Sequence, residues 1–334
     1  MIENAYIYGL ELISIIKMNL KSKQIDIETT NICSAKCPIC PRDEFTQKLG
    51  VMEYGLFKKI IDDIASYEVE YITLTGFGDP LADKHLFKRC QYIREKLPKV
   101  KIYISTTCAL MTPDKYDDII KYIDILKISI FGITKESYEK SHAGSLKFEK
   151  SYSNILGFID KIGQIENRPY LEALLVLTDI NNNEMDEWIQ YWEPKLDEVF
   201  VWKPHNFGDK KDYRVIDKKN MISCGRPENG QLYVHVDGKS SMCCFDINKQ
   251  LTVGDMNNQT IYDIFHSKEF KHLKKFHKNN DYEGTYCENC DQINYNPDVL
   301  IYSTDKTRKV GQKTLSKKPL LLPEKFKEKI ELYN

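Results

Sequence analysis

The chain has 334 residues, of which 42% are hydrophobic, and this is enough apolar material for one large domain and a smaller one. Its 48 lysines and arginines nearly balance its 49 aspartates and glutamates, so no overall field favours nucleic acid or an anionic membrane surface as a partner. Ten cysteines without a cleavable signal sequence indicate reduced thiols and metal ligation in the cytoplasm, and they argue against disulfides.

Predicted strands and helices alternate along the first two thirds of the chain. Residues 1–22 are expected to form an amphipathic helical extension, too short and too charged to span a membrane. Alternating or buried apolar runs predict strands at 24–29, 71–75, 100–105, 126–130, 170–177 and 199–203. Helical periodicity predicts helices at 54–67, 84–97, 113–123, 148–165 and 183–196. This order indicates an α/β fold with a parallel sheet, whose ligands bind at the carboxyl ends of the strands.

A cysteine array follows the first predicted strand. Cys33, Cys37 and Cys40 form CxxxCxxC within residues 31–42, NICSAKCPICPR. Three thiolates at this spacing can bind three irons of a cubane [4Fe-4S] cluster and leave the fourth iron open. Zinc sites usually have four ligands and favour CxxC pairs, and disulfide frameworks belong to short secreted chains. The array therefore favours an iron–sulfur cluster with an open iron.

This array resembles that of the radical S-adenosylmethionine (SAM) superfamily. The resemblance implies a partial (β/α)6 TIM-like barrel in which the methionine end of SAM chelates the open iron. It also implies that one-electron reduction cleaves SAM to a 5'-deoxyadenosyl radical, which takes a hydrogen atom from the substrate. The expected partner for that reduction is a cellular one-electron donor such as flavodoxin or ferredoxin.

The loop after the second predicted strand is the expected SAM loop. Gly76, Phe77, Gly78 and Asp79 stand where the superfamily usually carries a GGEP-like motif, with Phe77 replacing the second glycine and Asp79 replacing the glutamate. Glycines let the backbone approach a ligand closely, and a carboxylate can receive the amino group of the methionine moiety. An ordinary turn between a strand and a helix is the alternative, and the position one β/α unit after the cysteines favours SAM binding.

Hydroxyl side chains end the next two strands. Ser105 and Thr106 stand where superfamily members often place groups facing the ribose and carboxylate of SAM, and Ser129 lies in a SIFG context that resembles the family's SIDG. Hydroxyls in such places also cap helices and turns, so both roles stay open.

A second cysteine set resembles the auxiliary-cluster region of the SPASM and twitch subfamilies. Cys224, Cys243, Cys287 and Cys290 include a GxxxxC arrangement and a CxxC pair, CENC. Full SPASM domains carry further cysteines after the CxxC, whereas none follows Cys290, so one auxiliary [4Fe-4S] cluster is expected. A zinc ribbon is the alternative from spacing alone. Cys244 would donate a hydrogen atom in an epimerase if it faced the active site, and a packing role is its alternative.

These features predict four regions: a helical extension (1–22), the barrel (23–205), a linker with the auxiliary-cluster domain (206–300) and a basic tail (301–334). The layout resembles radical SAM dehydrogenases of sugars, aminocyclitols and polysaccharide precursors. We therefore expect dehydrogenation of a small polar, carbohydrate-like substrate, with Lys203 and His205 at the end of the sixth strand facing it. Alternatives are an epimerase, a maturase of a ribosomal peptide and a non-catalytic metal-binding scaffold.

Overall fold

The computed structural model describes residues 20–208, 210–293 and 299–304. The helix predicted within residues 1–22 lies almost entirely outside this range, and so does the tail from residue 305 onward. Within the described residues no helix is both long enough and apolar enough to cross a membrane.

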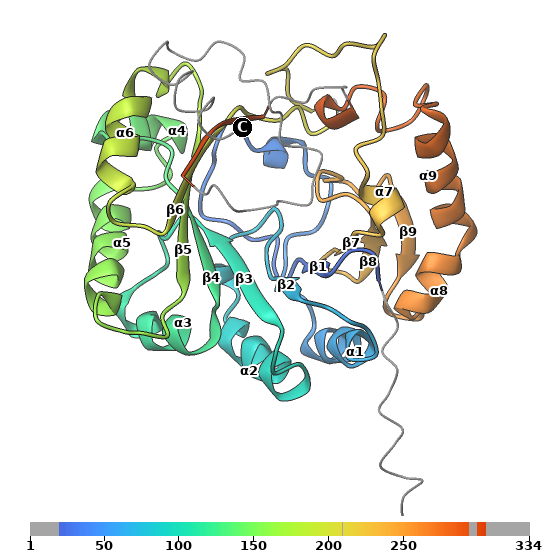
Figure 1. Ribbon diagram of the computed structural model, residues 1–334, viewed down its shortest axis with the longest axis horizontal. Helices are drawn as coiled ribbons and strands as arrows, with labels where there is room; N and C mark the ends of the chain where they lie inside the picture. Colours follow the sequence, from blue (N-terminus) through green and yellow to red (C-terminus); the bar gives the residue numbers. More distant parts are fainter. Residues whose placement is uncertain (1–19, 209, 294–298, 305–334) are drawn as a thin grey trace, which may run out of the picture.

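One ten-stranded sheet runs through the described residues, in the order β10-β6-β5-β4-β3-β2-β1-β7-β8-β9 (Figure 1). Its first six strands are neighbours in chain order and run parallel. They are β1 (Gln24–Ile27), β2 (Tyr71–Thr73), β3 (Lys101–Thr106), β4 (Ile125–Ser129), β5 (Tyr170–Val176) and β6 (Glu198–Trp202). This order confirms the predicted partial (β/α)6 barrel, with all six carboxyl ends at one edge.

Helices cover the outer face of this barrel (Figure 1). They are α1 (Tyr54–Ile64), α2 (Leu86–Lys96), α3 (Tyr116–Tyr122), α4 (Lys135–Ser141), α5 (Phe148–Ile162) and α6 (Met185–Trp192). Only α4 lacks a counterpart among the predicted helices of this region. Its sequence, KESYEKS, has little apolar periodicity, and it begins where the Thr134 side chain accepts a hydrogen bond from the Ser137 amide.

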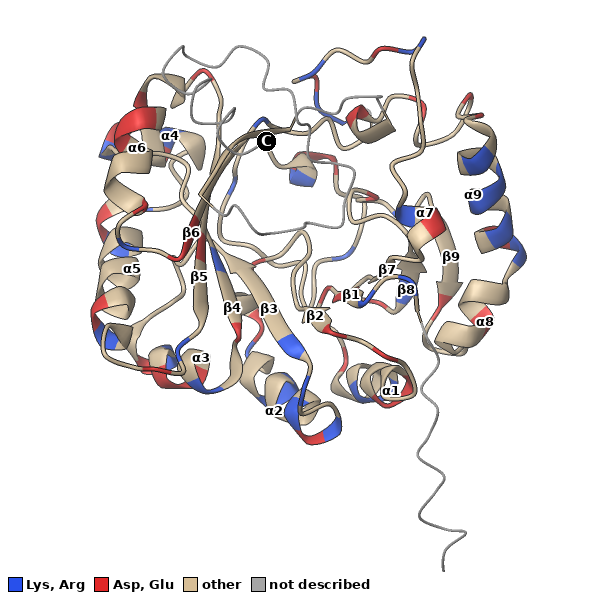
Figure 2. Cartoon of the chain, in the orientation of Figure 1, with Lys and Arg blue, Asp and Glu red and all other residues tan. Residues whose placement is uncertain are grey.

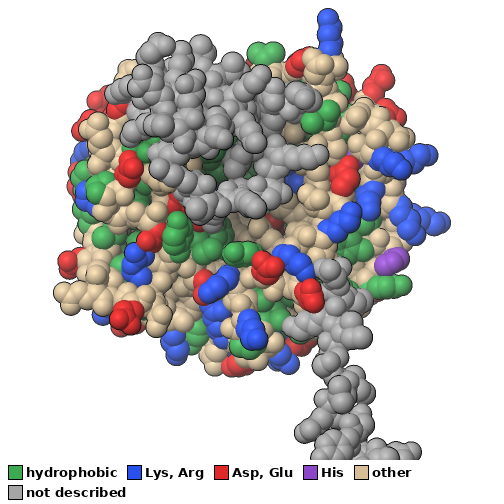
Figure 3. Space-filling view, in the orientation of Figure 1, with side chains coloured by type: hydrophobic (Ala, Val, Ile, Leu, Met, Phe, Trp, Pro, Cys, Tyr) green, Lys and Arg blue, Asp and Glu red, His purple; other side chains and the backbone are tan. Residues whose placement is uncertain are grey.

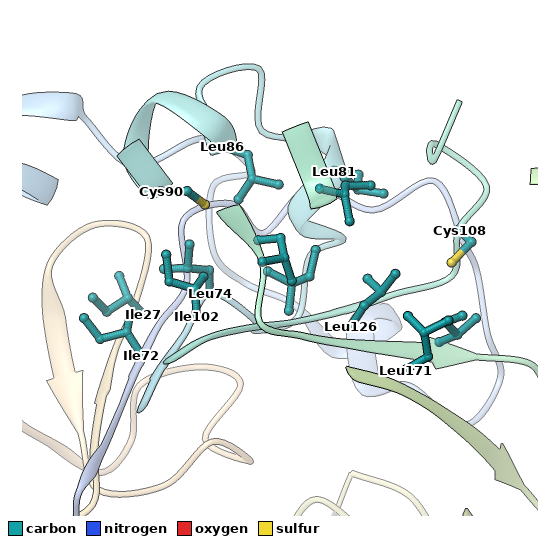
Figure 4. Packing of buried hydrophobic residues seen from close by; sticks show 14 of the residues in the cluster. Ile27, Ile72, Leu74, Leu81, Leu86, Cys90, Ile102, Cys108, Leu126 and Leu171 are labelled. Carbon is teal, nitrogen blue, oxygen red and sulfur yellow. The ribbon is translucent and has the colours of Figure 1, made fainter. Parts of the chain in front are cut away.

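The core lies between the sheet and these helices. Ile72, Ile102 and Leu126 are fully buried strand residues, and Figure 4 shows them gathered with Leu86 and Cys90 of α2. Side chains alternate between the two faces of a strand. The residues between these apolar positions therefore point to the inside of the barrel, which leaves that face free for polar groups.

The cysteine-rich region continues the barrel sheet. β7 (Leu232–Val234) pairs parallel with β1, and β8 (Lys239–Ser241) and β9 (Thr252–Asp255) follow it antiparallel. The short helix α7 (Arg226–Asn229) precedes them, and α8 (Ile261–His266) and α9 (Lys268–Asn279) cover them (Figure 1). Lysines follow the exposed side of α9 (Figure 2), while the rest of the visible surface mixes both signs of charge (Figure 3).

The edge strand β10 shows that the predicted boundary between the auxiliary-cluster domain and the tail, after residue 300, was wrong. Residues 301–303 were expected in the basic tail, but they belong to β10 (Leu300–Ser303), which pairs antiparallel with β6. Ile301 and Tyr302 are buried there. Four residues give too short a period to predict a strand, and the partner strand lies about a hundred residues earlier, so only the folded sheet provides the hydrogen bonds that make this strand.

Candidate active site and cluster sites

A cavity of about 290 Å³ lies at the carboxyl ends of the barrel strands. It is lined by predicted site residues from five separate segments of the chain. These are Cys33, Cys37, Cys40, Gly76, Phe77, Gly78, Asp79, Ser105, Thr106, Ser129, Lys203 and His205. Parallel strands bring their carboxyl ends to one edge, so residues as far apart in sequence as Cys33 and His205 share one cavity. Phe131, Leu174, Val176 and Phe207 add apolar wall that the sequence did not single out.

The first cysteine array forms one wall of this cavity. Cys33, Cys37 and Cys40 are all half-buried, and burial raises the pKa of Cys40 to about 11. Burial also raises the pKa of Cys37, and the charges of Cys40 and Cys33 add to that effect, so the three thiols interact with one another. The Ala35 amide donates a hydrogen bond to Cys33 Sγ at 3.4 Å, which stabilises a thiolate. Three mutually close sulfur donors fit a [4Fe-4S] cluster with one open iron.

Arg42 joins the cysteine loop to the SAM loop. Its Nη1 donates to the carbonyl oxygen of Phe77 at 2.8 Å and also to that of Asn31. Its guanidinium lies 5.3 Å from the centroid of the Phe45 ring. The sequence analysis did not select Arg42 as a site residue, although it ends the CPICPR segment. Its charge, directly after the three cysteines, was the feature that could have indicated a role in the site.

Glycines allow the SAM loop to lie against the cysteine loop. A Cβ on Gly78 would overlap the Thr30 carbonyl and approach the Ile32 carbonyl oxygen to 2.8 Å. The same loop is held by the Asp79 amide, which donates to the Ile32 carbonyl oxygen at 2.9 Å. Gly78 therefore lets the SAM loop come close to the backbone of the cysteine loop, as expected for a glycine.

Glu28, which directly follows β1, also holds the SAM loop in place, a role that the sequence analysis did not predict. This fully buried carboxylate accepts a hydrogen bond from the Phe77 amide at 2.8 Å and another from the Val236 amide at 3.3 Å. Burial raises the pKa of Glu28 to about 7, against the lowering effect of these two amides. Glu28 thus connects the SAM loop with the segment that follows β7.

Asp79 organises the ends of β2 and β3. Its carboxylate accepts hydrogen bonds from Thr106 Oγ1 and Thr107 Oγ1, both at 2.9 Å, and from the amides of Leu81 and Thr107 at 3.0 and 3.1 Å. Burial raises its pKa, while these bonds act in the opposite direction. The structure thus assigns Asp79 and Thr106 a clear structural role, and their predicted contacts with SAM stay predictions.

His205, on the cavity wall, belongs to a buried polar group. Its Nδ1 lies 3.0 Å from Asp291 Oδ2, and Arg214 Nη1 lies 2.5 Å from the same oxygen. Gln292 Nε2 donates a hydrogen bond to Asp291 Oδ2 at 3.0 Å. Burial alone would raise the pKa of Asp291, but the hydrogen bond and charge of His205 and the charge of Arg214 hold it at about 2. Asp291 directly follows Cys290 in the sequence, but nothing in the sequence indicated that it contacts His205.

The second cysteine set is partly buried: Cys224 and Cys243 are half-buried. Cys287 and Cys290 are buried in a small apolar cluster with Tyr282 and Ile293, and Cys224 packs against it. Burial raises the pKa of Cys290 to about 12. Burial also raises the pKa of Cys287, and the charges of Cys290 and Cys224 add to that effect, so these thiols are close to one another.

Cys243 completes this set. Burial raises its pKa well above the ordinary value, and Cys290 and Cys287 are among the charges that add to the shift. The Phe245 amide donates to Cys243 Sγ at 3.4 Å, and His277 Nε2 of α9 lies 3.5 Å from Cys287 Sγ. In the described ranges, no three His, Cys, Asp or Glu side chains are close enough to bind a single metal ion. Four thiols, two of them buried and two half-buried, with polar groups near sulfur fit a [4Fe-4S] cluster held by four cysteines, which is wider than one ion.

Cys244 is not among the residues that line the cavity. Burial raises its pKa, and the neighbours that act on it are Arg226, Asp26 and Cys224. Asp26 lies in β1, and the other two belong to the auxiliary region. Cys244 thus lies outside the cavity wall, and the hydrogen-donor role that an epimerase would require stays a prediction.

Comparison with known proteins agrees with both cysteine sites. Residues 27–190 match the family described as "Radical SAM superfamily", and residues 224–291 match SPASM, an "Iron-sulfur cluster-binding domain". The chain belongs to the radical SAM superfamily. It is a radical SAM oxidoreductase whose cofactors are SAM, a SAM-binding [4Fe-4S] cluster and an auxiliary cluster.

Two curated relatives are similar over different shares of the chain. The S-adenosyl-L-methionine-dependent 2-deoxy-scyllo-inosamine dehydrogenase of Niallia circulans is 25% identical over 277 residues, which is 80% of this chain and 92% of that protein. The tungsten-containing aldehyde ferredoxin oxidoreductase cofactor-modifying protein of Pyrococcus furiosus is 20% identical over 173 residues, 51% of this chain and 48% of that protein.

Solved structures share the fold. BtrN in complex with AdoMet and 2-DOIA is 19% identical, with a TM-score of 0.59 over 82% of this chain and 94% of BtrN. The enzyme anSMEcpe with bound AdoMet and the Cp18Cys peptide is 13% identical, with a TM-score of 0.60 over 83% of this chain and 88% of that one. One of these bound a small molecule and the other a peptide, so the fold alone does not choose a substrate class.

Proposed function

We propose that this radical SAM enzyme oxidises a secondary alcohol of a small aminocyclitol or sugar to a ketone. The observation that carries the proposal is the position of His205. It lines the same cavity as the cysteine array, and through Asp291 it connects to the segment of Cys290 in the auxiliary site. The similarity to a 2-deoxy-scyllo-inosamine dehydrogenase over most of both chains supports the substrate class.

The oxidation removes one hydrogen atom, one proton and one electron from the carbinol. When bound, SAM and the clusters supply the 5'-deoxyadenosyl radical that accepts the hydrogen atom and a one-electron acceptor for the electron. The remaining proton leaves the hydroxyl group, and we assign it to Nε2 of His205. We assign the proton of the neutral ring to Nδ1, where it donates to Asp291 Oδ2 at 3.0 Å beside Gln292 Nε2 at 3.1 Å, and Nε2 then carries the lone pair. The apolar side chains of the cavity wall, including Phe131 and Phe207, exclude water from the site.

The reaction is tested on anaerobically reconstituted enzyme with SAM, dithionite and 2-deoxy-scyllo-inosamine, beside a panel of related aminocyclitols and sugars. We expect 5'-deoxyadenosine and a keto product in equal amounts, and a deuterium at the oxidised carbon should appear in 5'-deoxyadenosine. A triple variant, with Cys33, Cys37 and Cys40 changed to alanine, should fall from about eight irons to about four and lose SAM cleavage. Cleavage of SAM without a ketone from any member of the panel would refute the substrate class.

The proton acceptor is tested by His205→Gln. Glutamine can keep a hydrogen bond to Asp291 but cannot take the proton, so ketone formation should fall by roughly 10²–10⁴-fold while SAM cleavage persists. His272→Gln, on the exposed face of α9, is the matched control and should leave both rates unchanged. Equal losses of SAM cleavage and ketone formation in His205→Gln would instead indicate a structural role.

A further inference from the structure

Arg226 is a buried arginine beside the auxiliary cysteines. It begins α7, two residues after Cys224, and only 7% of it is exposed. Gly225 makes the connecting turn with a φ of 81°, a conformation that favours glycine. The guanidinium carbon lies 4.9 Å from the centroid of the Phe245 ring. Arg226 Nε is buried, and it has no hydrogen-bond partner among the atoms that the structure describes.

The charge on Arg226 is permanent. Phe245, whose ring the guanidinium contacts, donates its backbone amide to Cys243 Sγ at 3.4 Å, so the cation lies beside the auxiliary cysteines. Burying an unpaired cation costs several kcal/mol, so a buried guanidinium requires an anionic neighbour. Within the described part of the chain, the ion pairs found for buried carboxylates do not include Arg226. Thiolates that ligate an auxiliary cluster, with Cys224 only two residues before Arg226, would supply this negative charge.

The acidic groups around this site have other partners. Asp291 is paired with His205 and Arg214. Asp246 accepts hydrogen bonds from the amides of Gln250 and Leu251, both at 2.7 Å. Asp26 is the buried carboxylate that Arg226 also influences, and it accepts hydrogen bonds from Gln231 at 2.9 Å and from Gln24 at 2.6 Å. A cluster with four thiolate ligands is anionic, and it gains a further negative charge on reduction.

We propose that Arg226 raises the reduction potential of the auxiliary cluster and so makes this cluster the electron acceptor of the enzyme. A fixed cation in a low-dielectric site stabilises the reduced, more negative cluster more than the oxidised one. At the cysteine array of the cavity, the positive charge of Arg42 is offset by a carboxylate. Asp79 lies there as well, and its charge raises the pKa of Cys33. The statement on the potential is independent of the substrate, while the electron-acceptor role rests on the proposed function.

The test is a potentiometric titration of the auxiliary cluster followed by electron paramagnetic resonance. The full-length variant with Cys33, Cys37 and Cys40 changed to alanine isolates this cluster, and Arg226→Gln, Arg226→Met and Arg226→Lys are introduced into it. The two neutral variants should lower the equilibrium constant for cluster reduction at least tenfold, which is about 59 mV for a one-electron couple. Arg226→Lys should keep most of the wild-type potential. Lys219→Gln, which removes an equal charge from an exposed position nearby, should leave the potential unchanged.

Each outcome decides the proposal. An unchanged potential in neutral variants that retain their iron would overturn it, because Arg226 would then only pack against Phe245. If the neutral variants lose the cluster, Arg226→Lys decides: iron retention restored by lysine supports the electrostatic role, and equal loss with lysine overturns it. Because no substrate is present, a wrong substrate class cannot produce any of these results. A shifted potential in an enzyme that forms no ketone would refute the proposed function alone.

Discussion

Cys33, Cys37 and Cys40 are half-buried on the wall of a cavity, whereas in the auxiliary set Cys287 and Cys290 are buried in a small apolar cluster and Cys224 and Cys243 are half-buried. The cavity site is shaped by backbone contacts, such as the hydrogen bond from the Asp79 amide to the Ile32 carbonyl, and leaves room for a ligand. The auxiliary site instead packs two of its thiols against apolar side chains. The difference fits the two roles proposed for the clusters, a site that admits SAM and a more protected site that accepts an electron.

Both sites nevertheless depend on one sheet. The parallel pairing of β1 with β7 places Ile27 opposite Val234, and Glu28 then accepts amides from the SAM loop and from the segment after β7. A change in either region can therefore reach the other through β1. The variants below separate local effects from shared ones.

Removal of one ligand from each site should give the largest contrast. Cys33→Ala should abolish 5'-deoxyadenosine formation, because the open-iron cluster loses one of its three ligands. Cys287→Ala should lose ketone formation and about four irons while SAM cleavage continues. Loss of the closed cluster should also lower the free energy of unfolding by several kcal/mol, since metal binding contributes to folding. Iron counts, product assays and thermal unfolding check the pair, and loss of SAM cleavage in both variants would show that the sites do not act separately.

Gly78→Ala should have an intermediate effect that is confined to the cavity. Its Cβ would overlap the Thr30 carbonyl, so the SAM loop must shift, at a cost of about 1–3 kcal/mol. We expect the KM for SAM to rise at least tenfold with auxiliary iron unchanged. Gly55→Ala in α1 meets nothing within 4 Å and should be neutral or up to about 1 kcal/mol stabilising. A normal KM in Gly78→Ala would contradict the close approach of the two loops.

Glu28→Gln should have the smallest effect at any one pH, but its sign depends on pH. The folded-state pKa of Glu28 is about 7, above its ordinary value of 4.5, so the stabilising contribution is complete below 4.5 and is lost as pH rises through 7. The wild type should therefore lose roughly 3 kcal/mol relative to the variant across this interval, from 1.36 kcal/mol per pKa unit. Thermal midpoints of both proteins at about pH 5 and about pH 8 measure this difference. A constant difference between the two would mean that Glu28 does not take up a proton in this range.

The parallel barrel and its cavity were predictable because their signals are local. Apolar periodicity locates each strand within a few residues, and the shared direction of the strands then brings Cys33, Gly76, Ser105, Ser129 and His205 to one edge. The CxxxCxxC and CxxC spacings identified both cysteine sets for the same reason. The domain boundaries after residues 22 and 205 and the individual SAM contacts stay predictions.

Only the tertiary structure decided what joins distant parts of the chain. The pairing of β7 with β1, the strand β10, the contact of His205 with Asp291 and the position of Arg226 among thiols all depend on such contacts. The same is true of Cys244, for which the sequence left a hydrogen-donor role and a packing role open and which does not line the cavity. Periodicity and spacing act over a few residues, whereas the two strand pairings and the contact of His205 with Asp291 join segments 86 or more positions apart. Their geometry is fixed by the packing of the whole sheet.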